Sequence, residues 1–398
     1  MALYAFDGTW NKAKTGEDKD LANTNVFRFF QAYDHNSPHP NFNMYIPGVG
    51  TRLKEIGKIF GGFFGMGELP RINEAYDRLC TAWAAGDRTI DIIGFSRGAA
   101  TTLDFCHCIQ ERGIRRPDSD DVVEPHPKIR FLGVWDVVAA FGLANLGNAA
   151  LNVGHHLSVP KSNLQFCFHA LALDERRPSF LPTRLNGAHE VWFRGVHSDV
   201  GGGNTNRGLN DITLKWMMSK AKAAGLPITE GDIAVLNPVP ATEPRPDRKL
   251  PLEVRPISPI DRCHYTISPM TGWATPPSTC PAETQADEQH AAELGAQSLE
   301  TLPRDARLRL DALWETADRE MKRREFSFGE ARDALGALFE SRVVLITTDQ
   351  QLQQAGASVV RLVNTMMDES HRRGFHLLHE VDLNEALFNL HPLFPFTE

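Results

Sequence analysis

The chain has 398 residues, of which 42% are hydrophobic and 23% charged, so it can bury a substantial core and belongs to the ordinary globular class. Its formal net charge of −8 argues against a general affinity for nucleic acid or for anionic membrane surfaces, because both attract basic proteins. Six cysteines without CxxC spacing argue against a disulfide framework and indicate reduced thiols.

The N-terminal part of the chain alternates short apolar runs with turns. Residues 2–6 predict a buried strand, and residues 44–46 predict a second, shorter one. Apolar positions at helical spacing predict a helix over residues 69–85, and residues 89–93 predict the next strand. Because the first residues lack the basic start and long apolar stretch of a secretory signal, we expect synthesis in the cytoplasm without Sec export.

The alternation of strands and helices continues as far as residue 236. A sharp turn joins the strand at 89–93 to a predicted helix at 99–109, and further strands are predicted at 129–135 and 190–196. A predicted helix at 211–224 follows. This order predicts an α/β fold whose mostly parallel sheet is covered by helices on both faces.

The composition changes after residue 236. Prolines punctuate residues 237–282, which are therefore predicted to be irregular. Residues 283–398 have a charged, mostly helical pattern, with a short strand predicted at 343–347. The predicted organisation is a catalytic core over residues 1–236, a Pro-rich segment over 237–282 and a helical C-terminal region over 283–398 that packs on the core.

One serine lies in the turn between a predicted strand and a predicted helix. Ser96 is flanked by Gly94 and Gly98, and α/β hydrolases use such a tight turn to hold a nucleophilic hydroxyl out of the sheet. The pattern GxSxG matches many chains by chance, and the alternative is an ordinary glycine-rich turn. The strand-turn-helix context favours an α/β-hydrolase-like fold with Ser96 as nucleophile.

A nucleophilic serine needs a histidine to take its proton and a carboxylate to fix the histidine tautomer. His197 follows a predicted strand on a glycine-rich loop and is the predicted base, although a lone histidine is usually a surface or core residue. Asp136 ends an apolar run, where a buried carboxylate gains nothing unless it is paired. Asp199 is the competing acid. The order Ser96, Asp136, His197 is the one expected of this fold.

The oxyanion of acyl transfer needs backbone donors. Arg97 opens the helix after the serine, and its N–H is the first predicted donor. The loop after the first strand supplies the second, from Gly8 or Thr9. Asp7 and Thr9 are equally well explained as turn caps. Asp7 beside another carboxylate would suit a cation, but no spacing demands one, so we predict neither a metal nor a cofactor.

Several ordered motifs resemble one known family. It is the type VI secretion phospholipase effector-like family of α/β hydrolases, formerly a domain of unknown function. The resemblance covers residues 1–230 and does not extend clearly to the helical C-terminal third. The motifs lie at residues 6–11, 47–51, 94–99, 169–175 and 192–203.

The resemblance implies a Ser-Asp-His triad at Ser96, Asp136 and His197. It also implies a carboxylic ester hydrolase, a phospholipase A-type enzyme or lipase, that type VI machinery delivers into a rival bacterium without a signal peptide. The expected partners are a phospholipid or other ester substrate, a membrane contacted peripherally, and an immunity or secretion-apparatus protein, but not nucleic acid. Two alternatives stay open: a serine esterase of soluble small substrates, and a non-catalytic scaffold with a vestigial serine turn.

Overall fold

The computed structural model describes most of the chain in two compact units. Unit 1 comprises Met1–Ala150 and Leu157–Leu294, and unit 2 comprises Leu151–His156 and Gly295–Glu398. The described residues are 1–8, 23–48, 69–138, 159, 163–177, 180, 182–185, 187–246, 255, 257, 261–294, 304–323 and 348–373. The predicted strand at 343–347 lies outside them.

Unit 1 is built on an eight-stranded sheet whose paired strands are all parallel. The strand order is β10-β9-β8-β7-β6-β3-β1-β2. This arrangement confirms the predicted α/β fold class. The strands are β1 (Ala2–Phe6), β2 (Met44–Ile46), β3 (Ile90–Phe95), β6 (Ile129–Trp135), β7 (Leu164–Ala172), β8 (His189–Phe193), β9 (Cys263–His264) and β10 (Ala282–Glu283).

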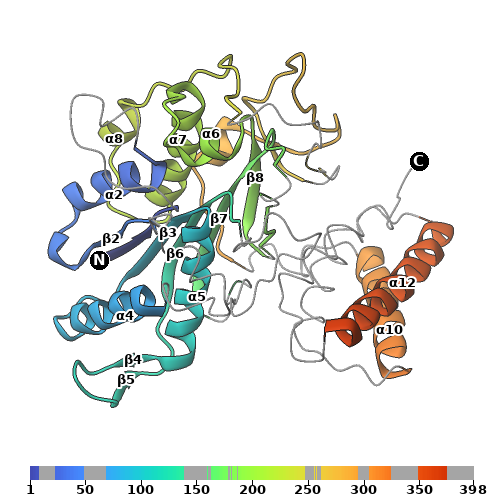
Figure 1. The fold of residues 1–398 in the computed structure, drawn as a ribbon, viewed down its shortest axis with the longest axis horizontal. Coiled ribbons are helices and arrows are strands. Elements are labelled where there is room, and N and C mark those ends of the chain that lie inside the picture. Colours follow the sequence, from blue (N-terminus) through green and yellow to red (C-terminus); the bar gives the residue numbers. More distant parts are fainter. Residues whose placement is uncertain are drawn as a thin grey trace. The chain divides into compact units, whose positions relative to one another are not determined.

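Helices cover both faces of this sheet (Figure 1). On one face, α4 (Leu69–Ala84) packs against α5 (Arg97–Arg112), which contacts β1, β3 and β6. On the other, α2 (Asn25–Asn36) and α7 (Arg207–Ala223) pack against each other and against the sheet. Parallel strands require such crossover connections, because after each strand the chain must return to the edge where that strand began before the next strand can start.

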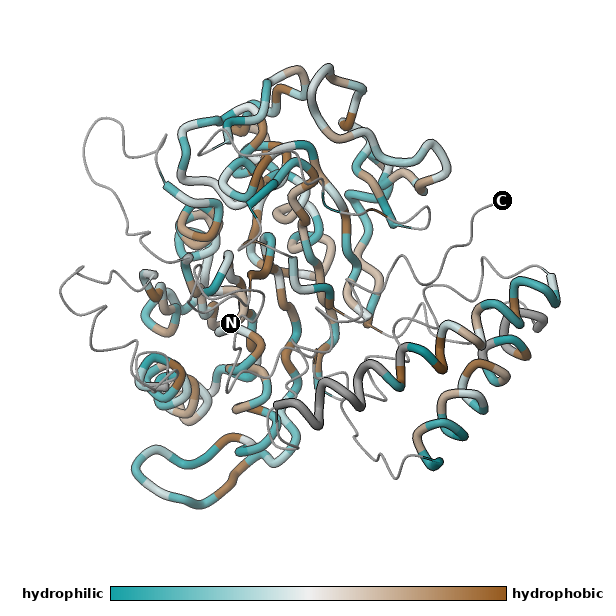
Figure 2. Tube along the Cα trace, turned by 45° about the vertical axis from the view of Figure 1, so that its right-hand side comes forward, coloured by the Kyte–Doolittle hydropathy of each residue, from teal (hydrophilic) through white to brown (hydrophobic). Residues whose placement is uncertain are grey.

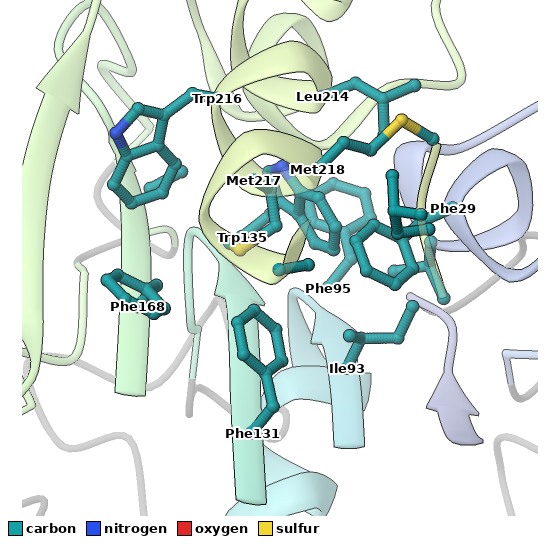
Figure 3. Packing of buried hydrophobic residues seen from close by; sticks show 14 of the residues in the cluster. Phe29, Ile93, Phe95, Phe131, Trp135, Phe168, Leu214, Trp216, Met217 and Met218 are labelled. Carbon is teal, nitrogen blue, oxygen red and sulfur yellow. The ribbon is translucent and has the colours of Figure 1, made fainter. Parts of the chain in front are cut away.

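The alternation of side chains along β1 shows how one strand serves both layers. Leu3 and Ala5 belong to the core cluster on the α2 and α7 side, whereas the rings of Tyr4 and Phe6 lie 5.3 and 5.5 Å from that of Phe105 on α5. Successive side chains of a strand point to opposite faces, so a strand covered on both sides is a continuous apolar run. Figure 3 shows the α7 side of this core.

Shorter elements complete unit 1. They are η1 (Pro40–Phe42), the antiparallel pair β4 (Ile114–Arg115) and β5 (Val122–Glu124), and the helices α6 (His197–Gly201), α8 (Glu230–Ala234) and α9 (Gln285–Glu288). β9 lies within residues 237–282, so that segment is not irregular throughout, and the sheet continues beyond residue 236. The predicted domain boundaries stay a prediction.

Among the described residues of unit 2, the helices α10 (Arg304–Arg323) and α12 (Asp349–Arg373) pack on each other. Their buried side chains recur at helical spacing, and both helices alternate between hydrophilic and hydrophobic stretches in Figure 2. Across the described ranges, none of the helices combines the length and the apolar character needed to cross a bilayer. The buried apolar residues are Leu313, Ala317 and Met321 on α10 and Ala355, Val359 and Val363 on α12.

Candidate active site

Ser96 occupies a strained turn between β3 and α5. Its φ of 58° and ψ of −127° lie outside the regions that non-glycine residues prefer. The flanking glycines are required by space: a Cβ on Gly94 would lie 2.8 Å from the Cα of Ala99, and one on Gly98 would lie 2.4 Å from the carbonyl oxygen of Phe6. Close packing on both sides therefore explains the GxSxG pattern at this position.

The structure brings Ser96, His197 and Asp136 into one chain of hydrogen bonds. Ser96 Oγ lies 2.8 Å from His197 Nε2, and His197 Nδ1 lies 2.7 Å from Asp136 Oδ2. An ionised carboxylate can only accept, so Nδ1 carries the proton and Nε2 is left to accept from the serine hydroxyl. The arrangement suits a serine nucleophile and its general base. We call these three residues the triad.

Asp136 follows β6 and is fully buried. Its own N–H donates to the carbonyl of Ala170 at 2.8 Å, and its Oδ1 accepts from the N–H of Ala172 at 3.0 Å. Arg255 donates to both carboxylate oxygens, Nη1 to Oδ1 at 2.6 Å and Nη2 to Oδ2 at 3.0 Å. Burial raises the pKa of Asp136, but the Arg255 guanidinium and the hydrogen bond from His197 outweigh it and hold the pKa well below its ordinary value.

The sequence predicted that His197 lies on a loop, but in the structure it begins the short helix α6. Its backbone N–H donates to Glu175 Oε2 at 3.1 Å, and Glu175 in turn pairs with Arg177 at 2.8 Å. The imidazole ring lies between two phenyl rings, 4.6 Å from that of Phe95 and 4.8 Å from that of Phe180. Backbone and ring are therefore both held in place.

A second histidine supports the turn that carries Asp136. The N–H of Val137 donates to His169 Nε2 at 3.2 Å, so His169 carries its proton on Nδ1, which lies 2.9 Å from Glu190 Oε1. Burial raises the pKa of Glu190, but Arg184 and His169 lower it to about 2. His169 is fully buried and acts as an anchor for the chain directly after Asp136.

Asp199, the competing acid, is committed elsewhere. Its Oδ1 accepts from the side-chain amides of Asn204 and Asn206 at 2.6 and 2.8 Å. Its Oδ2 accepts from the N–H groups of Val196 and Arg245 at 3.0 and 2.9 Å. The Val196 bond fixes the start of α6, since an acidic side chain can satisfy an N–H group there. Asp199 thus holds the helix that carries the histidine.

The predicted oxyanion donors flank the serine turn. Arg97 is the first residue of α5, and the N–H groups of a helix's first turn point outward along its axis. The end of β1 lies against the turn, because the carbonyls of Phe6 and Asp7 contact Gly98. The Gly8 N–H donates to Asp7 Oδ1 at 2.7 Å, so it must leave that carboxylate before it can bind an oxyanion. Thr9 lies outside the described residues.

Asp7 is a buried carboxylate that faces neutral donors. Its Oδ2 accepts from the hydroxyls of Thr24 and Tyr45 at 2.6 and 2.5 Å. Burial raises the pKa of Asp7 to about 6, an effect that these bonds and the Gly8 N–H only partly offset. In the part of the chain that the structure describes, no group of three or more His, Cys, Asp or Glu side chains is placed to hold a metal ion.

Sequence reasoning missed three residues around the triad. Arg255 lies in the Pro-rich segment, 119 positions from its partner Asp136, and no local pattern distinguishes it. Glu175 and His169 both lie in one motif of the family resemblance, but neither was given a role. The available signal was their place: His169 is a polar residue within an apolar strand, and Glu175 follows the end of that strand.

Comparison with known proteins identifies the family. The family model described as "T6SS, Phospholipase effector Tle1-like, catalytic domain" matches residues 3–126 and 110–220, more than half of the chain. A solved structure of an uncharacterized protein from Pseudomonas aeruginosa is 18% identical, with a TM-score of 0.37. The likeness covers 91% of this chain and 66% of that one. No curated protein matches the sequence significantly. The chain belongs to the type VI secretion system, Tle1-like phospholipase effector family.

Proposed function

We propose that this chain is a serine hydrolase that cleaves the carboxylic ester bonds of phospholipids. The observation that carries the proposal is the chain of hydrogen bonds from Asp136 through His197 to Ser96 at the carboxyl edge of a parallel sheet. Ligands and reacting groups of open α/β folds lie at this edge. Family membership supports phospholipid as the substrate.

In the proposed mechanism, His197 Nε2 takes the proton of Ser96 as Oγ attacks the ester carbonyl carbon. The negative oxygen of the tetrahedral intermediate is stabilised by the N–H of Arg97 and by the helix N-terminus behind it. His197 then donates the proton to the leaving alcohol oxygen as the ester bond breaks. His197 then takes a proton from a water molecule as that water attacks the acyl-enzyme, and returns the proton to Ser96 Oγ as the fatty acid leaves.

Membership in the family also supports two proposals about the protein's context: delivery by type VI machinery into a rival cell, and a cognate immunity protein in the producing cell. Expression in the periplasm of a susceptible bacterium tests whether the protein is toxic to a cell that receives it. The wild type should arrest growth and the Ser96→Ala variant should not. Equal arrest by both would contradict the proposal that toxicity is hydrolytic.

A fluorophosphonate probe and phospholipid vesicles together test the reaction. The wild type should be labelled and should release fatty acid, and Ser96→Ala should lose labelling and at least about a thousandfold in turnover. Ser119→Ala, in the turn between β4 and β5, is the control and should retain both. Labelling without lipid cleavage would favour an esterase of soluble substrates. No labelling of the wild type would favour a non-catalytic protein.

A further inference from the structure

Arg255 is an unusual neighbour for the carboxylate of a triad. It is 4% exposed and makes the two hydrogen bonds to Asp136 described above. Nη1 also donates to the carbonyl of Ala172 at 2.7 Å, and Nη2 donates to that of Phe180. The guanidinium is therefore locked by four acceptors. Arg255 lies outside the residues that match the family model.

The positive charge of Arg255 repels the positive charge that develops on His197 during catalysis. Asp136 stabilises the imidazolium that forms when His197 takes the serine proton. The guanidinium binds both oxygens of Asp136, so the negative charge of Asp136 is divided between Arg255 and the imidazolium that forms on His197. Among the described residues, the charged or titratable groups near the pair include Glu175 with Arg177, at the His197 N–H, and His169, behind Val137.

We infer that Arg255 is a positioning residue that fixes Asp136 and sets the lower pH limit of activity. The inference rests on the proposed triad function. By keeping Asp136 ionised, Arg255 preserves the carboxylate that orients His197 at acidic pH. Without Arg255, the buried Asp136 would retain a proton more easily. This change raises the pH at which the active form appears.

The test compares the pH profile of kcat/KM in the wild type, Arg255→Gln and Arg255→Lys. Arg255→Gln should move the acid limb upward by about one pH unit, the lower end of the effect of an adjacent opposite charge. It should also lower kcat/KM at neutral pH by roughly 10- to 100-fold, no more than a positioned acid–base group contributes. Arg255→Lys keeps the positive charge but loses the paired N–H donors of the guanidinium. Its acid limb should therefore stay near that of the wild type while its rate falls.

Arg130→Gln is the matched control. Arg130 pairs with the fully buried Asp91 at the amino ends of β6 and β3, on the opposite edge of the sheet. Its loss should lower stability without moving the acid limb. A shift equal to that of Arg255→Gln would mean that any lost ion pair moves the limb, and would overturn the inference.

Fluorophosphonate labelling of the wild type separates the two levels of proposal. If the wild type is not labelled at Ser96, the proposed function fails. If it is labelled and a folded Arg255→Gln variant keeps the wild-type profile and rate, the function stands and the inference is wrong. If Arg255→Gln does not fold, Arg255→Lys decides: the wild-type rate at every pH would overturn the positioning role.

Discussion

Asp7 and Asp136 are both buried carboxylates at the carboxyl edge of the sheet, yet their pKa values move in opposite directions. Burial raises the pKa of each. Asp136 faces the cation Arg255, whereas Asp7 accepts from the neutral hydroxyls of Thr24 and Tyr45. Arg255 outweighs the cost of desolvating Asp136, whereas the neutral donors of Asp7 only partly offset that cost. For these two carboxylates, the charge of the partner accounts for the opposite directions.

Asp7 makes stability depend on pH. Its pKa of about 6 lies above that of an unfolded aspartate, about 4. Between these values the native state binds more protons, so the free energy of unfolding falls as pH rises through this window, by about 3 kcal/mol in total. Asp7→Asn removes this loss. In urea unfolding from pH 4 to 7, the free energy of unfolding of Asp7→Asn should rise relative to that of the wild type as pH rises. The control Asp77→Asn, on an exposed part of α4, should keep the wild-type slope; parallel curves for Asp7→Asn would contradict the prediction.

His169→Leu should affect both stability and rate. The substitution leaves the N–H of Val137 without its acceptor, and a buried N–H without a partner costs about 1–3 kcal/mol. Because Val137 follows Asp136, the rate of fluorophosphonate labelling should fall as well. The comparison is His189→Leu, which breaks a hydrogen bond from β8 to the buried Glu283 on β10. It should lower the urea midpoint without slowing labelling. Wild-type labelling by a folded His169→Leu would refute the anchoring role.

At the scale of elements, the serine turn depends on close contact between β1 and α5. A methyl group on Gly98 would overlap the carbonyls of Phe6 and Asp7. Gly98→Ala should therefore push the end of β1 away, lower the free energy of unfolding by about 1–3 kcal/mol and reduce labelling of Ser96. Gly231→Ala on α8 meets nothing closer than 3.5 Å and should be neutral or stabilising by up to about 1 kcal/mol. Equal melting temperatures for both variants would contradict this.

Elements were predictable where one strand or helix carried its own pattern. The apolar runs of β1 and β6 and the helical spacing of α4 gave their positions within a few residues. The sequence predicted a loop where α6 forms, because the run of glycines at residues 201–203 is typical of loops. The start of the helix is fixed by the hydrogen bond from the Val196 N–H to Asp199, which the glycine pattern does not reveal. β9 has two residues and takes its conformation from its neighbours β8 and β10. Such a strand leaves no periodic signal.

At the scale of the molecule, the parallel sheet gathers residues that are far apart in sequence. Ser96 follows β3, Asp136 follows β6 and His197 follows β8, so three strand ends meet at one edge. This is why the sequence could predict the members of the triad separately and in order. It could not predict Arg255, because no local pattern distinguishes a residue that lies 119 positions from its partner Asp136. The catalytic roles stay predictions.

Truncation tests which part of the chain makes up the catalytic body. Unit 1 ends at Leu294, whose N–H donates to the carbonyl of Gln165 at 2.6 Å. A chain ending there keeps Arg255 and the buried Glu283, which binds Lys220 at 2.8 Å. A chain ending at residue 236 loses both and would leave Lys220 and Asp136 buried without their oppositely charged partners Glu283 and Arg255, each at a cost of several kcal/mol.

We therefore expect the chain that ends at Leu294 to fold and to be labelled at Ser96, and the chain that ends at residue 236 to fail in both respects. Circular dichroism and fluorophosphonate labelling of the two purified chains provide the measurement. Labelling of the shorter chain would support a core that ends at residue 236 and would remove Arg255 from the requirements for activity. Failure of the longer chain would show that folding of unit 1 needs residues 295–398, because every described strand of the sheet is present in it.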